Sequence, residues 1–198
     1  MNLIKPLIVF AGSGTIVATG AYLTRDSWIS SKKTKTPFKR VSQALLDNNY
    51  KPLDTTRADS WKSILSKYNA AYSVTKTTVD LQNECRVLLE KEEFNDGDYQ
   101  KARRWCVETQ SVQNRLGFFN RASLSTSSDT DDSKWKEKIT SHKGVHSNKL
   151  NHNFGDEEAK NVTDIKSECG KLSSKESVDE DFESSFSKFY EWCSVNSQ

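Results

Sequence analysis

Hydrophobic residues recur at steps of three and four along most of this chain, a spacing that gathers them on one face of an α-helix. The pattern predicts a short helix ending near residues 47–49 and another starting at residues 135–139. Longer amphipathic helices are predicted at about residues 59–72, 77–92, 98–117, 156–172 and 182–193. Only 3 prolines and 8 glycines interrupt the chain, which favours long helices over many short strands. The sequence therefore predicts an all-α fold in which helix packing supplies the core.

An uncharged segment precedes this pattern. The 19 residues from Pro6 to Thr24 carry no formal charge, whereas the whole chain is polar, with a mean hydropathy of −0.76. A membrane-spanning helix needs about 20 mostly apolar residues, and the core of a secretory signal needs about 7 to 15. We therefore expect residues 1–24 to form an N-terminal membrane helix, either an uncleaved anchor or a cleaved signal peptide. Burial in a protein core is the remaining alternative.

The charges after this segment leave the orientation of the protein open. Between Arg25 and Arg40 there are six basic residues and one acid, Asp26. Lys and Arg near a membrane span tend to stay on the cytoplasmic side, which would keep the following body inside the cell. A signal peptide with a positively charged start would export that body instead.

Two stretches of the chain share one order of motifs, which indicates an internal duplication. Each has a Trp-Lys pair, then Cys-x-x-Leu, then Asp-x-Asp before an aromatic residue, then Trp-Cys. In the first stretch these motifs begin at Trp61, Cys85, Asp96 and Trp105. In the second stretch they begin at Trp135, Cys169, Asp179 and Trp192. We expect two divergent helical-hairpin repeats, at about residues 57–120 and 130–198.

The segment between the two copies, residues 122–133, is rich in Ser, Thr and Asp, a composition that cannot bury enough apolar surface to fold by itself. The expected domains are therefore a signal or anchor, a basic linker, a first helical repeat with a preceding short helix, a flexible linker and a second helical repeat. Their boundaries are 1–24, 25–36, 37–120, 121–133 and 134–198.

The four cysteines are candidates for one disulfide in each repeat, Cys85 with Cys106 and Cys169 with Cys193. Cys85 and Cys106 lie at similar distances on either side of the predicted turn at residues 95–98, so an antiparallel helix pair would bring them face to face. The second pair is less symmetric about its predicted break. Disulfides persist only in an oxidising compartment, and in the cytosol the alternative is four buried thiols.

The sequence offers no catalytic, cofactor-binding or metal-binding motif. A net charge of +2 gives no electrostatic case for nucleic acid. His142 and His146 are four residues apart, but Gly144 lies between them and no third zinc ligand accompanies them. All three histidines lie in one irregular segment, so none is suited to activate a cysteine nucleophile. We expect no enzymatic activity and no small-molecule substrate.

Two further motifs have two interpretations each. Arg103 and Arg104, beside Trp105, could form a recognition patch, but we favour an arginine pair at the edge of the core. Asn161 begins an Asn-x-Thr sequence that fits a glycosylation acceptor, and we expect it to lie on a helix surface.

The chain resembles paralogous uncharacterised membrane-anchored proteins of about 200 residues from haemotropic mycoplasmas. The resemblance rests on the Gly-rich start, the WKSILSKY segment at residues 61–68, the run from Cys85 to Cys106 and the closing Trp192-Cys193. It implies a membrane-anchored product of a wall-less bacterium, with a suspected role at the host-facing surface, and it supplies no catalytic residues.

We therefore expect a non-enzymatic binding protein at the cell membrane, with its body outside the cell. Its expected partners are membrane lipid, through the N-terminal helix, and a host protein, contacted through loops such as residues 122–133 and 142–153. The alternative is a cytoplasm-facing membrane adaptor with reduced cysteines.

Overall fold

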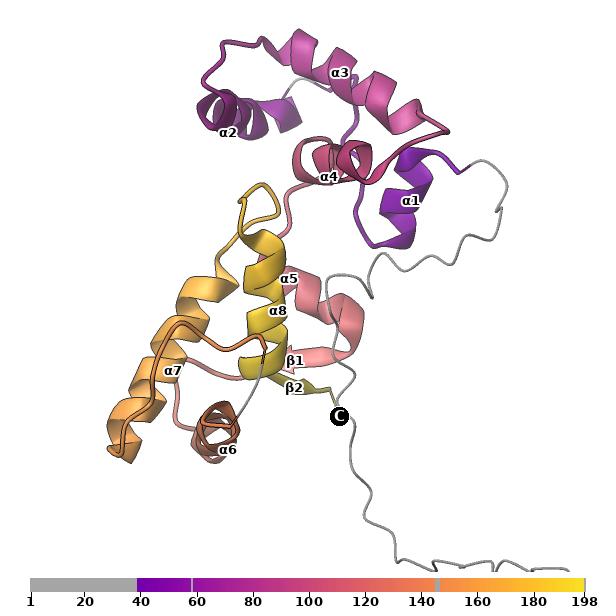
Figure 1. Cartoon of the computed structure of the whole chain (residues 1–198). Helices are drawn as coiled ribbons and strands as arrows, with labels where there is room; N and C mark the ends of the chain where they lie inside the picture. The colour runs from indigo at the N-terminus through magenta and orange to yellow at the C-terminus, as the bar shows by residue number, and fades with distance from the viewer. Residues whose placement is uncertain (1–38, 58, 145–146, 198) are drawn as a thin grey trace, which may run out of the picture. The chain divides into compact units, whose positions relative to one another are not determined.

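The structure is a computed structural model that describes residues 39–57, 59–144 and 147–197. The expected anchor at residues 1–24 and the basic linker at residues 25–36 lie outside the described residues. The described residues belong to one compact unit, which is mostly helical (Figure 1). Within them, no helix has both the length and the apolar character needed to cross a membrane.

The first four helices form what we call the N-terminal helical group, α1 to α4. These are α1 (Val41–Asp47), α2 (Lys62–Tyr72), α3 (Thr78–Glu90) and α4 (Asp96–Trp105), with a 3-10 turn η1 (Asp59–Trp61) before α2. Two capping boxes fix where helices begin: Thr77 and Asp80 cap α3, and Asn95 and Asp98 cap α4. Helix α1 packs on α3 and α4, and α2 packs on α3.

The C-terminal helical group, α5 to α8, repeats this set of contacts. Its elements are α5 (Val112–Leu116), η2 (Gly117–Phe119), β1 (Arg121–Ser123), α6 (Asp132–His142), α7 (Glu158–Ser173), α8 (Phe182–Trp192) and β2 (Ser194–Asn196). Helix α5 packs on α7 and α8, and α6 packs on α7. In Figure 1, β1 and β2 lie beside the end of α8.

Four tryptophans lie at the centre of the two groups. Trp61, Trp105, Trp135 and Trp192 are each at most 1% exposed, and two of them come from each group. Each buries a large apolar ring, and because its indole N–H needs a partner inside the protein, each also fixes a hydrogen bond. The helical ranges predicted at residues 59–72, 77–92, 156–172 and 182–193 supply 13 of the 26 other hydrophobic side chains that are buried.

Three parts of the described chain differ from the sequence-based prediction. A two-stranded antiparallel sheet is present, in which Ala122 pairs with Val195, so the fold is mostly but not entirely helical. The single helix predicted over residues 98–117 is wrong, because α4 ends at Trp105 and α5 begins at Val112. Between them the chain runs extended, since Val107 forms a β-bridge with Pro52 and the Ser111 side chain caps α5.

Residues 121–133 differ from the flexible linker expected from their composition. They contain β1 and the buried Leu124, and their polar side chains are used locally. The Asp131 carboxylate accepts a 2.8 Å hydrogen bond from the Ser125 amide, and the Lys166 ammonium donates to the Ser128 carbonyl at 3.0 Å. The Ser, Thr and Asp side chains thus form a hydrogen-bonded turn.

Candidate functional site

The first disulfide joins the middle of α3 to the end of α4. Cys85 and Cys106 are 21 residues apart in sequence, and their Cα atoms are 5.4 Å apart. Both side chains are 1% exposed. The Cys106 carbonyl also accepts a 2.9 Å hydrogen bond from the Leu53 amide, which holds the segment before α2 against the disulfide. The bond therefore lies in the interior of the N-terminal helical group.

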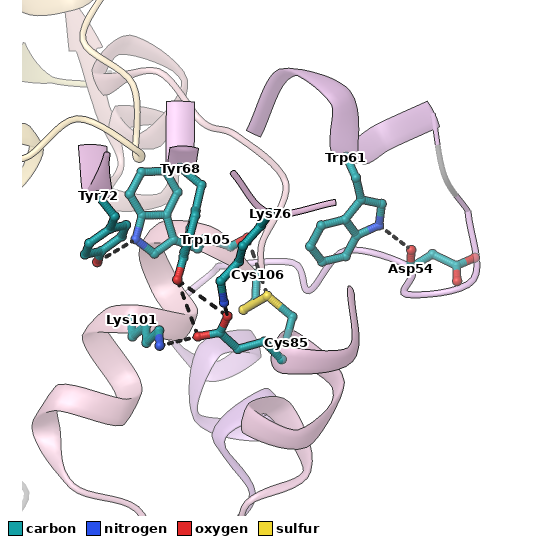
Figure 2. Close-up of a disulfide and its surroundings, with 10 residues drawn as sticks. Asp54, Trp61, Tyr68, Tyr72, Lys76, Cys85, Lys101, Trp105 and Cys106 are labelled. Atoms are coloured by element: carbon teal, nitrogen blue, oxygen red, sulfur yellow. Dashed lines mark hydrogen bonds and ion pairs between the residues drawn. A yellow bond between two sulfur atoms is a disulfide. The ribbon is translucent and has the colours of Figure 1, made fainter. Parts of the chain in front are cut away.

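Aromatic side chains surround Trp105, next to this disulfide (Figure 2). The Trp105 Nε1 donates a 3.2 Å hydrogen bond to the Tyr72 hydroxyl, and the Tyr68 ring meets the indole edge-on at 5.1 Å. The Arg104 guanidinium lies over the Trp105 indole, 4.6 Å from its ring centre. Tyr72 is half exposed, so this cluster reaches the surface through the tyrosine while the indole itself stays buried.

Glu84 links α3 to α4 and to the segment before α3 through two ion pairs. It forms ion pairs with Lys76, before α3, and with Lys101, on α4 (Figure 2). Burial by itself would raise the pKa of Glu84, but hydrogen bonds from Lys101 and Lys76 outweigh it and hold the pKa below its ordinary value. The same bonds raise the pKa of each lysine, so all three groups stay charged at neutral pH.

The second disulfide occupies the same place in the C-terminal helical group. Cys169, on α7, and Cys193, after α8, are 24 residues apart with Cα atoms 5.6 Å apart. The Cys193 carbonyl accepts a 2.9 Å hydrogen bond from the Leu124 amide. Trp192 donates from Nε1 to the Asn148 carbonyl at 2.6 Å. All four cysteines of the chain are thus paired.

The tryptophans that begin the two motif series make matching contacts. Trp61 Nε1 donates to the Asp54 carbonyl at 2.9 Å, and Trp135 Nε1 donates to the Ser125 carbonyl at 3.0 Å. Each acceptor follows the leucine that is bonded to the second cysteine of its group.

The starts of the two groups also match. Val41, the first residue of α1, donates from its amide to the Lys91 carbonyl at 3.0 Å, and Val112, the first of α5, donates to the Lys175 carbonyl at 2.8 Å. Eight residues after each valine stands an asparagine with positive φ: Asn49 at 59° and Asn120 at 52°. Asparagine tolerates this left-handed conformation better than most residues.

Each group has an arginine–tyrosine cation–π pair at equivalent positions, but the position that holds the arginine in one group holds the tyrosine in the other. In the N-terminal group the Arg103 guanidinium lies 5.8 Å from the Tyr50 ring centre. In the C-terminal group the arginine is Arg121, and it lies 4.4 Å from the ring of Tyr190, two residues before Trp192. Arg103 likewise stands two residues before Trp105, and Tyr50 and Arg121 each follow their positive-φ asparagine.

The connection between α7 and α8 joins the two groups. The Ser177 amide donates to the Gln110 carbonyl at 2.8 Å, and the Val178 carbonyl accepts from Arg104 Nε at 2.7 Å. Val178 is buried among the core residues of the N-terminal helical group. A connection within one group thus supplies a side chain to the core of the other.

A buried guanidinium lies near this junction. Arg115 is 3% exposed and its guanidinium lies 4.0 Å from the ring centre of Tyr50. The Tyr50 hydroxyl donates to Glu183 at 3.1 Å, and Arg103 pairs with the same carboxylate at 3.1 Å. Burial, and then the Glu183 charge, raise the pKa of Tyr50, while burial raises that of Tyr99 to about 12. Both tyrosines therefore remain protonated at physiological pH.

Arg103 is 7% exposed and Arg104 bonds within the junction, which agrees with the favoured arginine pair at the edge of the core and not with an open recognition patch. The structure corrects two other sequence-based interpretations. Asn161 was expected on a helix surface but is buried, and its Nδ2 donates to the Gly155 carbonyl at 2.9 Å. His142, expected in an exposed loop, is a buried residue at the end of α6. His146 lies outside the described residues.

Within the described ranges, no group of three or more His, Cys, Asp and Glu side chains is arranged to hold a metal ion. The residues form two buried disulfides. Beside each lie a buried tryptophan and a short β-pairing, the Pro52–Val107 bridge in the N-terminal helical group and β1–β2 in the C-terminal helical group. Comparison of the chain with protein-family models, with curated proteins and with solved structures found no match.

Proposed function

We propose that this chain is a membrane-anchored, non-enzymatic binding protein whose disulfide-bonded helical body lies outside the cell. The observation that carries the proposal is that every cysteine is buried in a disulfide. Such bonds persist in oxidising compartments and are rare in the cytosol, where thiols are kept reduced. This favours export over the alternative, a cytoplasm-facing adaptor with free thiols.

The polar side chains of the described body support a structural use over a catalytic one. Ion pairs such as Lys101 with Glu84 and Lys136 with Glu158 join one helix to another, and the buried charges at Arg103 and Arg115 contact aromatic rings and backbone carbonyls. A rigid frame of this kind can present surface loops to a macromolecular partner. A host protein is the partner that we propose, with lipid contacted through residues 1–24.

We further propose that the body consists of two divergent copies of one helical module. The support is the recurrence of the helix pairings, the disulfide, the tryptophan hydrogen bonds and the positive-φ asparagine in the same order. In this proposal the two copies start at α1 and at α5, earlier than the sequence motifs alone indicated. An experimentally determined structure tests this: residues 41–110 and 112–197 should superpose with their cysteines coincident.

The proposed location is tested on intact cells that express the full chain. A membrane-impermeant protease is added, and the chain is followed by gel electrophoresis with and without reductant after free thiols have been blocked. We expect digestion of the body in intact cells and a faster-migrating, disulfide-bonded species without reductant. Digestion only after detergent permeabilisation, together with four alkylated cysteines, would contradict export.

A matched control separates location from folding. The Cys85→Ala/Cys106→Ala variant retains the second disulfide, so it should show a smaller shift on reduction and the same accessibility to protease in intact cells. A soluble cytosolic protein in the same cells must survive the protease, which shows that the membrane is intact.

A further inference from the structure

The connection between α6 and α7, residues 143–157, is much longer than the equivalent connection between α2 and α3, residues 73–77. Its described residues fold back over the end of α8. Leu150 is buried, and the Asn148 carbonyl accepts the hydrogen bond from Trp192 Nε1 at 2.6 Å. In the N-terminal helical group, the hydroxyl of Tyr72 accepts the corresponding bond from Trp105. The long connection therefore covers Trp192 and completes its hydrogen bonding.

The His142 side chain holds this connection through one hydrogen bond and two ring contacts. His142 is 3% exposed, and its Nε2 accepts a 2.9 Å hydrogen bond from the Leu150 amide. Its ring meets Trp192 at 4.6 Å and Phe154 at 4.9 Å, both edge-on. His142 stands seven residues after Trp135, as Tyr68 does after Trp61, so a titratable ring occupies the place that a tyrosine has in the other group.

The direction of the Leu150 hydrogen bond fixes the charge state of the ring. A nitrogen that accepts a proton cannot carry one, so the folded arrangement requires a neutral imidazole with its hydrogen on Nδ1. Protonation would point an N–H group at the Leu150 amide N–H, and it would place a charge between two apolar rings. Both effects disfavour the closed connection.

We propose that His142 is a pH-operated latch, which holds residues 147–157 over Trp192 while the ring is neutral and releases them when the ring is protonated. Release uncovers Leu150 and the indole of Trp192, so acid exposes an apolar surface that is buried at neutral pH. The latch does not depend on the proposed location, and its failure would leave the case for export unchanged.

The charged groups on the surrounding elements have partners of their own. On the connection, His152 pairs with Asp164 of α7 at 3.2 Å and meets the other side of Phe154 at 4.9 Å. Lys143 donates to the Gly155 carbonyl at 2.8 Å. On α8, Lys188 donates to the Asn151 side chain at 2.9 Å.

Two more charges lie where α6 meets α8. Lys138 of α6 donates to the backbone carbonyl of Glu191 at 2.5 Å, and the Glu191 side chain is exposed. Burial, and then the charge of Arg121, lower the pKa of Lys138. Lysines and acidic residues are equal in number, nine each, on α6, the connection, α7 and α8, so the case for the latch rests on the geometry around the His142 ring.

Nuclear magnetic resonance of the full chain in detergent micelles tests the latch. At pH 7.5 we expect the His142 ring as the Nδ1–H tautomer, read from its two ring nitrogen shifts. Below the ordinary histidine pKa of about 6.5, amide exchange at Leu150, corrected for its intrinsic pH dependence, should accelerate by up to tenfold per pH unit. A ring protonated on Nε2 at pH 7.5, or corrected exchange that stays constant down to pH 5, would overturn the proposal.

Two variants assign the effect to the correct histidine. His142→Gln keeps an oxygen acceptor but cannot be protonated, so its Leu150 exchange should not depend on pH after correction. His152→Gln removes the other described histidine of the connection and should leave the acceleration in place. If His152→Gln abolishes the acceleration while His142 still titrates, the latch is not at His142.

Discussion

Arg104 Nε donates a 2.7 Å hydrogen bond to the carbonyl oxygen of Val178, a residue 74 positions later in the chain. The Val178 side chain is packed in the core of the N-terminal helical group, although it belongs to the connection between α7 and α8. Because the carbonyl and the side chain of one residue are both held by the other group, loss of either group removes contacts from the remaining one. We therefore expect the two groups to unfold together.

The Arg104→Met variant tests this bond. Methionine keeps an apolar stem over Trp105 but cannot donate to the Val178 carbonyl. We expect the free energy of unfolding to fall by about 1 to 3 kcal/mol, the usual cost of losing a charge-assisted hydrogen bond. Urea unfolding measures it, and Arg86→Met, at an exposed position on α3, is the matched control with an expected change below about 0.5 kcal/mol. Equal stability of the two variants would show that the bond does not contribute.

The two disulfides should contribute nearly equally to the free energy of unfolding. They close loops of 21 and 24 residues, and a loop of this size is worth about 3 kcal/mol through its effect on the unfolded chain. We expect Cys85→Ala/Cys106→Ala and Cys169→Ala/Cys193→Ala each to lower the free energy of unfolding by about that amount. Urea unfolding under oxidising conditions measures both. A variant as stable as the unaltered chain would contradict the expected contribution of its disulfide.

The matching tryptophans should respond alike to substitution. Trp61→Phe and Trp135→Phe each remove an indole N–H and leave a backbone carbonyl, of Asp54 or of Ser125, without its donor. We expect each change to cost about 2 to 4 kcal/mol from the lost hydrogen bond and the smaller ring. Thermal unfolding followed by circular dichroism measures the loss, with Val87→Ala at an exposed site as control. A large loss in only one variant would count against the proposed duplication.

The stability contributed by Glu84 should depend on pH. Because its pKa is lowered in the folded chain, the contribution is fully present above the ordinary value of 4.5 and is lost as the pH falls through the folded value. At pH 7 we expect Glu84→Gln to be less stable by about 1 kcal/mol, as for a pair of partly exposed ion pairs. The difference should shrink below pH 4.5, as measured by urea unfolding at several pH values. A deficit for Glu84→Gln that stays constant over this pH range would contradict the assignment.

Helical periodicity predicted the long helices because their burial is one-sided and local. The predicted run over residues 156–172, for example, corresponds to α7 at Glu158–Ser173, with Val162, Ile165 and Cys169 buried. The pairing of Cys85 with Cys106 followed from the same argument, since residues equally far from a turn face each other in adjacent helices. Local spacing was sufficient wherever the contact was between neighbouring helices.

Contacts between distant segments could not be predicted in this way. Ala102 and Cys106 happen to continue at helical spacing into Val112 and Leu116, so periodicity alone joined α4 and α5 into one helix. The break is imposed by Pro52, far away in sequence, which pairs with Val107. Ser111 was the one local signal, because a serine before a hydrophobic run is a typical helix cap.

The extent to which two polar side chains are buried was not predicted, for a related reason. Asn161 and Arg103 have side chains that are normally exposed, and each is buried because a backbone carbonyl, of Gly155 and of Ser177, lies where it can accept a hydrogen bond. Those carbonyls are placed by connections between helices. The sequence carries no regular pattern that predicts their positions.

The arginine–tyrosine pairs, Arg103 with Tyr50 and Arg121 with Tyr190, limit which segments of the two groups could be exchanged by genetic recombination. A hybrid in which α8 replaced α4 would set the tyrosine of Tyr190 beside Tyr50, and the reciprocal hybrid would set the guanidinium of Arg103 against that of Arg121. The first loses an attraction, and the second confines two like charges in one partly buried place. Such hybrids would be less stable unless the exchanged segment carried both partners of the pair together.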